Sequence, residues 1–460
     1  MSGVTNALNL AKAGLLTGQK ALEVAGNNIA NVNTPGYSRE VPVFSEFPTV
    51  MIQGVVIGTG AGIRMINREH DVFLARQIQD KNAFLGAENG KTAPLAEVER
   101  IVDISDAGLA ASIDRFFGAW QELSGSPGDR VAREAVLDSG SRLAAAFAAP
   151  IDQLQAEQRN IDITLGARVT ELNAKFKEVA ELNQTIAGIE SGGPSALSAR
   201  DRRDVLLQEI SYALGGRSYE SPESGMVSYY LPNGLPLLQD GSAYSLELVT
   251  GTGVQDLELN IGSQQVTLDR NKVGGEINGL LTVRDQVIPD LIADLDKLAF
   301  TLANEVNAVH QLGMGRDGVS GRDFFVPPVA QTGSAGNLAL SLSDYTQVAA
   351  GLTDAPGDNR NSLAITALGG ALLIDGDSTF SGYYGRLATS IGVDVSTNKV
   401  AAKGTQDSLD LLNNMRDNTV GVSVEEEMVS LIRYQKAFEA SAKYLSVVND
   451  MLDVLVNVGG

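Results

Sequence analysis

The chain has 460 residues, enough for roughly two to four domains with a sizeable buried core. Its 35 basic and 56 acidic side chains give a net charge of −21, which repels nucleic-acid phosphates and anionic membranes, so neither is expected as the main partner. It contains no cysteine and two histidines, His70 and His310, which excludes disulfides, thiolate or histidine-rich metal sites and a cysteine nucleophile.

The sequence carries no sign of membrane insertion. No apolar run reaches the length of a membrane span, and the first residues lack the basic-then-apolar pattern of a cleaved signal peptide. These features alone predict a cytoplasmic protein. The absence of cysteine also suits a chain that crosses a membrane unfolded and finishes outside, where free thiols oxidise.

Apolar residues at both ends of the chain recur at alternating steps of four and three. The front stripe contains Leu8, Leu15, Leu22 and Ile29, with Ala11, Gly18 and Ala25 between them. The back stripe contains Leu431, Gln435, Phe438, Leu445, Asn449 and Leu452. This spacing is typical of a coiled-coil seam, so we expect the two ends to pair, with the small front residues allowing close packing.

The paired ends have two interpretations: a helical hairpin that covers its own core, or an interface at which chains assemble. Residues 1–36 carry only Lys12, Lys20 and Glu23 as charged side chains, and a helix so poorly charged is expected to be buried by more than one neighbour. A lone helix pair also buries too little surface to be stable. We therefore expect the ends to be largely disordered in the monomer and to order on assembly.

Amide side chains interrupt both stripes. Gln435 and Asn449 are either tolerated at a wet seam or act as buried amides that fix its register. Asn28 and Asn31 lie in the run Asn27–Tyr37, where the front helix stops. They are either helix-end and turn residues or amides that hydrogen-bond a neighbouring subunit.

Between its ends the chain alternates between helical and strand-like patterns. Residues 41–66 predict an irregular hairpin, residues 215–275 a small all-β insert, and residues 338–342 one further strand. Helices are predicted within 74–147, with a break at 124–128, and at 151–189, 198–214, 276–310, 361–373, 382–391 and 406–416. A final helix begins at the N-cap Ser423, with Glu425–Glu427 in its first turn.

The predicted fold is mainly α with a β insert, elongated and multidomain. A terminal coiled-coil domain comprises residues 1–36 and 405–460, and a helical-bundle domain with a β-hairpin comprises 37–211 and 276–404. Residues 212–275 form a small β outer domain, expected at the far tip of this nested layout.

Catalytic and cofactor motifs are missing from the sequence. Gly58–Gly62 resembles a phosphate loop, but no helix and no Walker lysine follow it. Asp375–Asp377 lacks the glutamate that a calcium loop needs, because Arg386 stands there. Paired carboxylates could support a glycosidase, but nothing favours one. We expect no enzymatic activity, no metal and no cofactor.

Both ends of the chain resemble the terminal signatures of flagellar rod, hook and hook-associated proteins. The front residues are Gly14-Leu15, Gln19, Ala21-Leu22 and Asn27–Tyr37, and the back ones include Glu426–Met428, Leu431-Ile432, Tyr434-Gln435 and Met451-Leu452. Internal runs resemble the hook-associated protein 1 family of the hook–filament junction: Phe116–Leu123, Asp201–Asp204 and Pro356–Asn359. The resemblance covers nearly the whole chain and is weakest over Gly215–Gly275.

The resemblance implies a structural protein of the bacterial flagellum, exported unfolded through the flagellar type III apparatus and then secreted. It implies a cytoplasmic chaperone on the C-terminal helix before export. It also implies self-association in an axial ring beneath the distal cap, with hook protein below and a second junction protein above. The assembly interface would be formed by the two stripes together with Asn28 and Asn31.

Two alternatives stay open. Another axial protein, such as a short hook protein, is distinguished by the regions Asp201–Asp204 and Pro356–Asn359. From a different class, a secreted carbohydrate-acting wall hydrolase would be revealed by peptidoglycan digestion.

Overall fold

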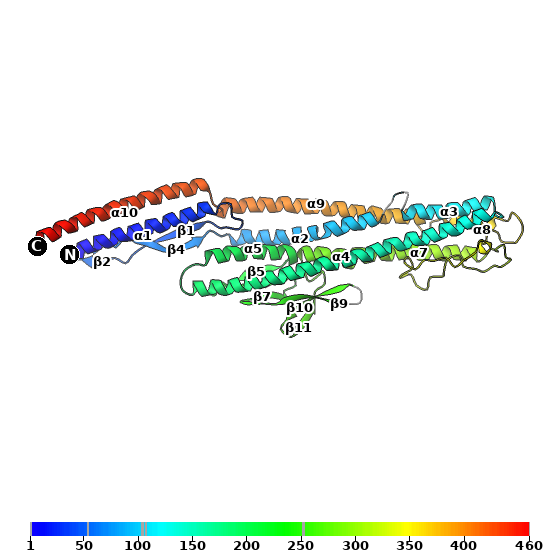
Figure 1. Cartoon of the computed structure of the whole chain (residues 1–460), viewed down its shortest axis with the longest axis horizontal. Helices are drawn as coiled ribbons and strands as arrows, with labels where there is room; N and C mark the ends of the chain where they lie inside the picture. The colour runs from blue at the N-terminus through cyan, green and yellow to red at the C-terminus, as the bar shows by residue number, and fades with distance from the viewer. Residues whose placement is uncertain (1, 53–54, 103–104, 106–107, 251–253, 460) are drawn as a thin grey trace.

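The computed structural model describes residues 2–52, 55–102, 105, 108–250 and 254–459. They form an elongated, mainly helical molecule whose two termini lie side by side at one end (Figure 1). The predicted class, mainly α with a β insert and paired terminal helices, is confirmed.

The narrow end of the molecule consists of two helices and a hairpin. Helix α1 (Ser2–Ala30) lies against α10 (Val424–Gly459) (Figure 1). Strand β1 (Glu40–Glu46) pairs antiparallel with β4 (Ala61–Arg68), and the hairpin tip is formed by β2 (Val50–Ile52) and β3 (Val55–Ile57). A bulge between Val43 and Phe44 makes the hairpin irregular, as predicted for residues 41–66.

The helical bundle forms the long body of the molecule. Its helices are α2 (Val72–Ile101), α3 (Leu109–Gly125), α4 (Arg130–Glu190), α5 (Leu197–Leu214), α6 (Gly275–Thr282), α7 (Ile288–His310), α8 (Arg360–Leu368) and α9 (Phe380–Val420). A π-helical turn, η1 (Val283–Val287), joins α6 to α7. At the far end, residues 311–359 form loops with one 3₁₀ turn, η2 (Tyr345–Gln347), beside a buried aromatic cluster that contains Trp120 and Phe324.

The β insert consists of two antiparallel sheets. The four-stranded sheet contains β5 (Arg217–Glu220), β6 (Val227–Tyr230), β7 (Pro236–Gln239) and β8 (Ser242–Ala243), and the three-stranded sheet contains β9 (Ser245–Thr250), β10 (Gln255–Ile261) and β11 (Gln264–Thr267). The insert lies beside the middle of the bundle, so its expected place at the far tip is wrong (Figure 1). The 18 residues of α5 return only about 27 Å along the bundle before the insert begins.

Two predicted helix breaks are absent. Pro150 lies inside α4, where the buried neighbours Phe147, Ile151 and Leu154 hold the helix in the core despite the missing N–H. Helix α9 likewise continues through residues 392–405, which the sequence predicted as a gap between two helices. Packing against the rest of the bundle therefore overrides the local breaker signals.

Contacts to α2 explain why α9 is continuous. The side-chain amide of Asn398 donates hydrogen bonds to Glu88 O (3.1 Å) and Thr92 Oγ1 (2.9 Å), and Val395 is buried one turn away. The proposed domain boundary between residues 404 and 405 falls inside this helix. We keep the three-part division as a proposal and place its last boundary at Gly421, where α9 ends.

The strand predicted at 338–342 is wrong. Only one isolated bridge forms there among the described residues, between Phe325 and Leu340. Side chains of α7 hold the neighbouring loop instead: the Asp296 carboxylate accepts hydrogen bonds from Gly333 N (2.7 Å) and Ala335 N (2.8 Å). A loop fixed by long-range side-chain bonds needs no sheet ladder to satisfy its backbone.

Candidate assembly site

Small residues line α1 along its contact with α10. They are buried or half-buried and recur at alternating steps of three and four: Ala11, Gly14, Gly18, Ala21 and Ala25. A Cβ atom added to Gly18 would lie 3.2 Å from Phe438 Cβ, and one added to Gly14 would lie 2.6 Å from Ser441 Oγ. The two helix backbones therefore approach closely, and the predicted close packing is confirmed.

The large stripe residues lie along the same contact. All are half-buried: Leu8, Leu15, Leu22 and Ile29 on α1, and Leu431, Phe438, Leu445 and Leu452 on α10. Between the α10 leucines, the seam uses Tyr434, Ser441 and Val448, and Val448 is only 2% exposed.

The predicted place of Gln435 and Asn449 in the apolar seam is wrong, because both side chains are exposed. One inward row of α10 lies one position earlier than predicted, at Tyr434 and Val448, about 100° around the helix from Gln435 and Asn449. The hairpin explains this shift: the ring of Phe44 packs against Tyr434 with centroids 6.1 Å apart. Helix α10 contacts two neighbours, α1 and the hairpin, whereas the heptad prediction assumed contact with α1 alone.

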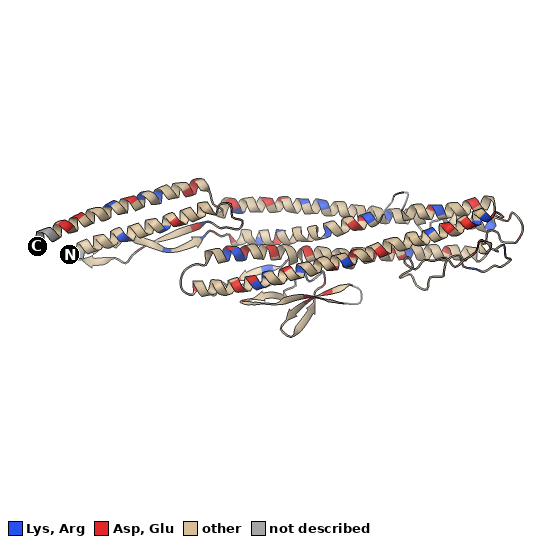
Figure 2. Cartoon of the chain, in the orientation of Figure 1, with Lys and Arg blue, Asp and Glu red and all other residues tan. Residues whose placement is uncertain are grey.

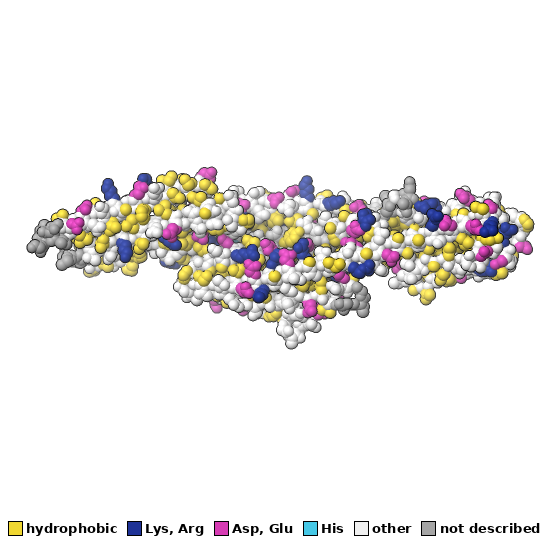
Figure 3. All heavy atoms as spheres, in the orientation of Figure 1, with side chains coloured by type: hydrophobic (Ala, Val, Ile, Leu, Met, Phe, Trp, Pro, Cys, Tyr) yellow, Lys and Arg dark blue, Asp and Glu magenta, His cyan; other side chains and the backbone are white. Residues whose placement is uncertain are grey.

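Helix α10 leaves a second apolar face open. Val429 is 61% exposed, and Ile432, Val447, Met451 and Val454 are also exposed along the helix. Apolar side chains gather over this end of the molecule in the space-filling view (Figure 3). These residues form two apolar patches, at Val429–Ile432 and at Val447–Val454, separated on the same side of the helix by the exposed Lys436 and Lys443. Exposed apolar patches mark contacts with another protein or copy.

The turn after α1 is built around Asn28. Its Nδ2 donates to Glu40 O (2.9 Å), while its Oδ1 accepts from Tyr37 Oη (2.8 Å) and Glu40 N (2.9 Å). Asn28 is buried and its amide is bonded within the chain, so the expectation that it bonds a neighbouring subunit is wrong. Asn31 donates to Asn27 O (3.0 Å) and remains half-buried.

Burial shapes the electrostatics of this turn. It raises the pKa of Tyr37, with a smaller contribution from the nearby carboxylate of Glu40. It also raises the pKa of Glu40 itself. The Tyr37 hydroxyl therefore stays protonated at neutral pH, as the hydrogen bond that it donates to Asn28 requires.

Arg39 ties the start of the hairpin to the start of α10. Its Nε lies 2.7 Å from Glu427 Oε1, and its Nη1 lies 3.1 Å from Glu426 Oε2. Glu427 is buried, and Arg39 N also donates to Val420 O at the end of α9. The predicted cap is present, since Glu426 N donates to Ser423 Oγ at 3.4 Å, but the acidic turn also anchors this corner.

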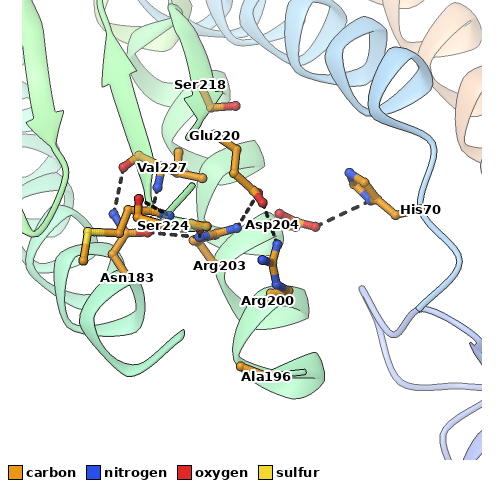
Figure 4. Close-up of polar contacts among 12 residues, drawn as sticks. His70, Asn183, Ala196, Arg200, Arg203, Asp204, Ser218, Glu220, Ser224 and Val227 are labelled. Carbon is orange, nitrogen blue, oxygen red and sulfur yellow. Dashed lines mark hydrogen bonds and ion pairs between the residues drawn. The ribbon is translucent and has the colours of Figure 1, made fainter. Parts of the chain in front are cut away.

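The run Asp201–Asp204 of α5 holds the base of the hairpin. Arg68 of β4 places Nη1 2.8 Å from Asp201 Oδ1 and Nη2 2.6 Å from Asp204 Oδ2, while Ser38 N donates to Asp201 (3.1 Å). His70 points toward Asp204, with 3.8 Å between Nδ1 and Oδ2 (Figure 4). Burial lowers the pKa of His70, against the opposing effect of Asp204.

Arg203 on the same run is fully buried and faces the β insert. It donates from Nη1 to Gly225 O (2.6 Å) and to Asn183 Oδ1 (3.1 Å), and from Nη2 to Glu220 (2.7 Å) (Figure 4). Arg200 reaches Glu220 from the other side at 2.7 Å. One turn of α5 therefore joins three parts of the molecule: the hairpin, the bundle and the insert.

Sequence reasoning missed Arg39, Arg68 and the buried role of Glu427. A faint signal existed, because Glu427, Tyr434, Ser441 and Val448 are seven residues apart. Only Val448 is aliphatic, so a search for apolar periodicity does not detect this row of inward-facing residues. Within the described ranges, no group of three or more acidic, histidine or cysteine side chains could hold a metal, and no helix is long and apolar enough to cross a membrane.

The close approach at Gly18 gives a stability prediction. Gly18→Leu would force the side chain against Phe438 and is expected to destabilise the α1–α10 pair by about 1–3 kcal/mol. Gly26→Leu is the matched control, because a Cβ there meets nothing within 4 Å and leucine favours helix over glycine. Hydrogen exchange of the α1 amides should be faster in the first variant and not in the second. Equal protection, measurable in wild type, would contradict the close packing, whereas unprotected α1 amides in wild type would mean that the pair orders only on assembly.

Three family comparisons match this architecture. The family described as flagellar hook-associated protein FlgK helical domain matches residues 95–325, about half of the chain. The chain belongs to the FlgK family. The paired ends match two further descriptions: flagella basal body rod protein at residues 8–37, and flagellar basal body rod FlgEFG protein C-terminal at residues 417–458. FlgK membership makes this chain a structural component of the bacterial flagellum.

Individual relatives agree with the FlgK assignment. Flagellar hook-associated protein 1 of Bacillus subtilis is 28% identical, covering 100% of both chains, and that of Escherichia coli is 23% identical, covering 99% of this chain and 100% of the relative. The flagellar hook junction protein FlgK from Burkholderia pseudomallei shares the fold, with a TM-score of 0.68 and 15% identity over 76% of this chain and 100% of that one. The short-hook-protein and wall-hydrolase alternatives gain no support from these matches.

Proposed function

We propose that this protein is a non-enzymatic component of the hook–filament junction, on which the filament assembles. Its relatives over the full chain are named hook-associated protein 1, and its fold is that of a hook junction protein. The observation that carries the proposal is the terminal pair, with small residues closing the α1–α10 contact and a second apolar face of α10 open.

The terminal helices are the proposed assembly interface. The exposed side chains of Gln435 and Asn449 and the half-buried Asn31 are available to a neighbouring subunit, whereas Asn28 is not. The large open apolar surface supports the hypothesis that the ends order fully only on assembly, since a helix pair in water gains too little from its own contact.

The partners follow from this placement. We propose self-association in an axial ring beneath the distal cap, hook protein below and a second junction protein above. Before export, the open face of α10 is the proposed site for a cytoplasmic chaperone that hands the chain to the type III export apparatus. The protein is then secreted unfolded, which the absence of cysteine supports.

Electron microscopy of cells that lack the gene tests the proposal. We expect complete hooks without filaments, and flagellin released into the medium. Loss of the hook itself would instead indicate that the protein is a component of the hook or rod. Cells with intact motile filaments would contradict the junction role.

A further inference from the structure

The described side chains of the hairpin tip are apolar and largely exposed, and together they form a knob. Met51 of β2 is 73% exposed, and Val55 and Val56 of β3 are each more than 60% exposed. No charged residue occurs from Phe47 to Ile63, and the hairpin and α1 carry few charges in Figure 2. An isolated two-stranded hairpin is marginal in water, so a tip open on this scale gains stability from being covered.

An uncharged groove lies on the same end of the molecule. It has a volume of about 240 Å³ and runs between α1, α10 and the distal end of the β1–β4 ladder. Gly14 and Gly18 form its floor on α1, Tyr434 and Ala437 its wall on α10, and Ala61 its wall on β4. Thr17 Oγ1 donates to Ala61 O (3.1 Å), which holds the distal end of the β1–β4 ladder beside the groove.

The chain does not fill this groove with its own tip. The groove is bounded by Phe44 and Ala61 at the distal end of the β1–β4 ladder, next to β2 and β3. The high exposure of Met51 and Val56 shows that neither side chain sits in the groove of its own chain. Knob and groove are therefore both open in a single copy.

We propose that the hairpin tip of one copy enters the α1–α10 groove of a neighbouring copy. Charge favours a second copy as the occupant: each chain carries −21, so copies repel except where they meet through uncharged surfaces, and both surfaces here are uncharged. The groove is also continuous with the terminal pair. A contact between two different surfaces repeats from copy to copy and builds a ring when the rotation closes.

This inference rests on the proposed junction function, and disulfide trapping tests it separately. Cells would produce two versions with different epitope tags, one with Met51→Cys and one with Ala437→Cys, in place of the native gene. Because the native chain has no cysteine, a disulfide between the two tags can come only from the engineered pair. Isolated flagella should give a reducible dimer that carries both tags, at least tenfold above a control pair of Met51→Cys and Lys443→Cys.

Filaments that form normally with no more cross-linking than the control pair would overturn the contact and leave the junction function intact. Filaments in cells that lack the gene would overturn the function itself. Val56→Asp gives an independent readout: we expect an unchanged circular dichroism spectrum of the purified monomer but at least a tenfold loss of filaments. Normal filament numbers in that variant would also overturn the contact.

Discussion

Leu445→Asp is expected to leave the helical bundle folded and to abolish junction assembly. Leu445 is half-buried on α10, next to the buried Val448 of the same seam. A carboxylate there loses the apolar contact and must be desolvated against α1, at a cost of about 2 kcal/mol or more. A terminal pair with little stability of its own cannot absorb this loss.

Two measurements separate assembly from folding. Thermal unfolding of the purified variant, followed by circular dichroism, should show the bundle transition at an unchanged temperature. Electron microscopy of complemented cells should show hooks without filaments. Ser446→Asp is the matched control for the α1–α10 pair, because it adds the same charge at an exposed position of α10 and should leave the contact with α1 intact. Normal filaments with Leu445→Asp would refute the role of the α1–α10 pair.

The terminal pairing could be predicted from the sequence because heptad spacing is a local signal that survives without knowledge of the neighbours. What could not be predicted is which row of α10 turns inward. That choice depends on the hairpin, since Phe44 reaches Tyr434 from a segment nearly four hundred residues away in the chain. Small residues such as Gly14 and Ala21 carry the α1 contact but contribute little to an apolar pattern.

The bundle shows the same limit. Pro150 and the glycines near residue 400 are breakers in isolation, but long helices pass through both because their flanking residues are buried. The corner that joins the terminal pair to the bundle depends on Arg39, Arg68 and Glu427, whose partners come from distant segments. Charged pairs of this kind have no periodicity, and only the folded chain reveals them.

His310 at the far end gives the second large effect, a loss of stability in mild acid. The residue is buried at the end of α7, where its Nδ1 lies 2.7 Å from Arg322 O and its Nε2 accepts a hydrogen bond from Ala349 N (3.0 Å). Both bonds require the neutral ring with its proton on Nδ1, because a proton on Nε2 would face the Ala349 N–H. The ring therefore joins α7 to two parts of the 311–359 loop.

Burial lowers the pKa of His310 from 6.5 to about 4, partly opposed by the Arg322 carbonyl and the Asp323 carboxylate. The unfolded chain thus binds this proton more tightly than the folded chain, so its contribution is complete above pH 6.5 and is lost as the pH falls toward 4. The loss amounts to about 2 kcal/mol at pH 5 and about 3 kcal/mol at pH 4.

Urea unfolding of wild type and of His310→Gln between pH 7 and 5 measures this loss. Glutamine is neutral throughout and keeps a donor and an acceptor, so its free energy of unfolding should fall by about 2 kcal/mol less than that of wild type over this range. His70→Gln is the control for the other histidine, whose pKa burial also lowers. Parallel curves for wild type and His310→Gln would mean that the buried ring takes up its proton without disturbing the loop. Most carboxylates titrate below pH 5, so a difference in unfolding free energy between wild type and His310→Gln above pH 5 reports on His310 and not on the carboxylates.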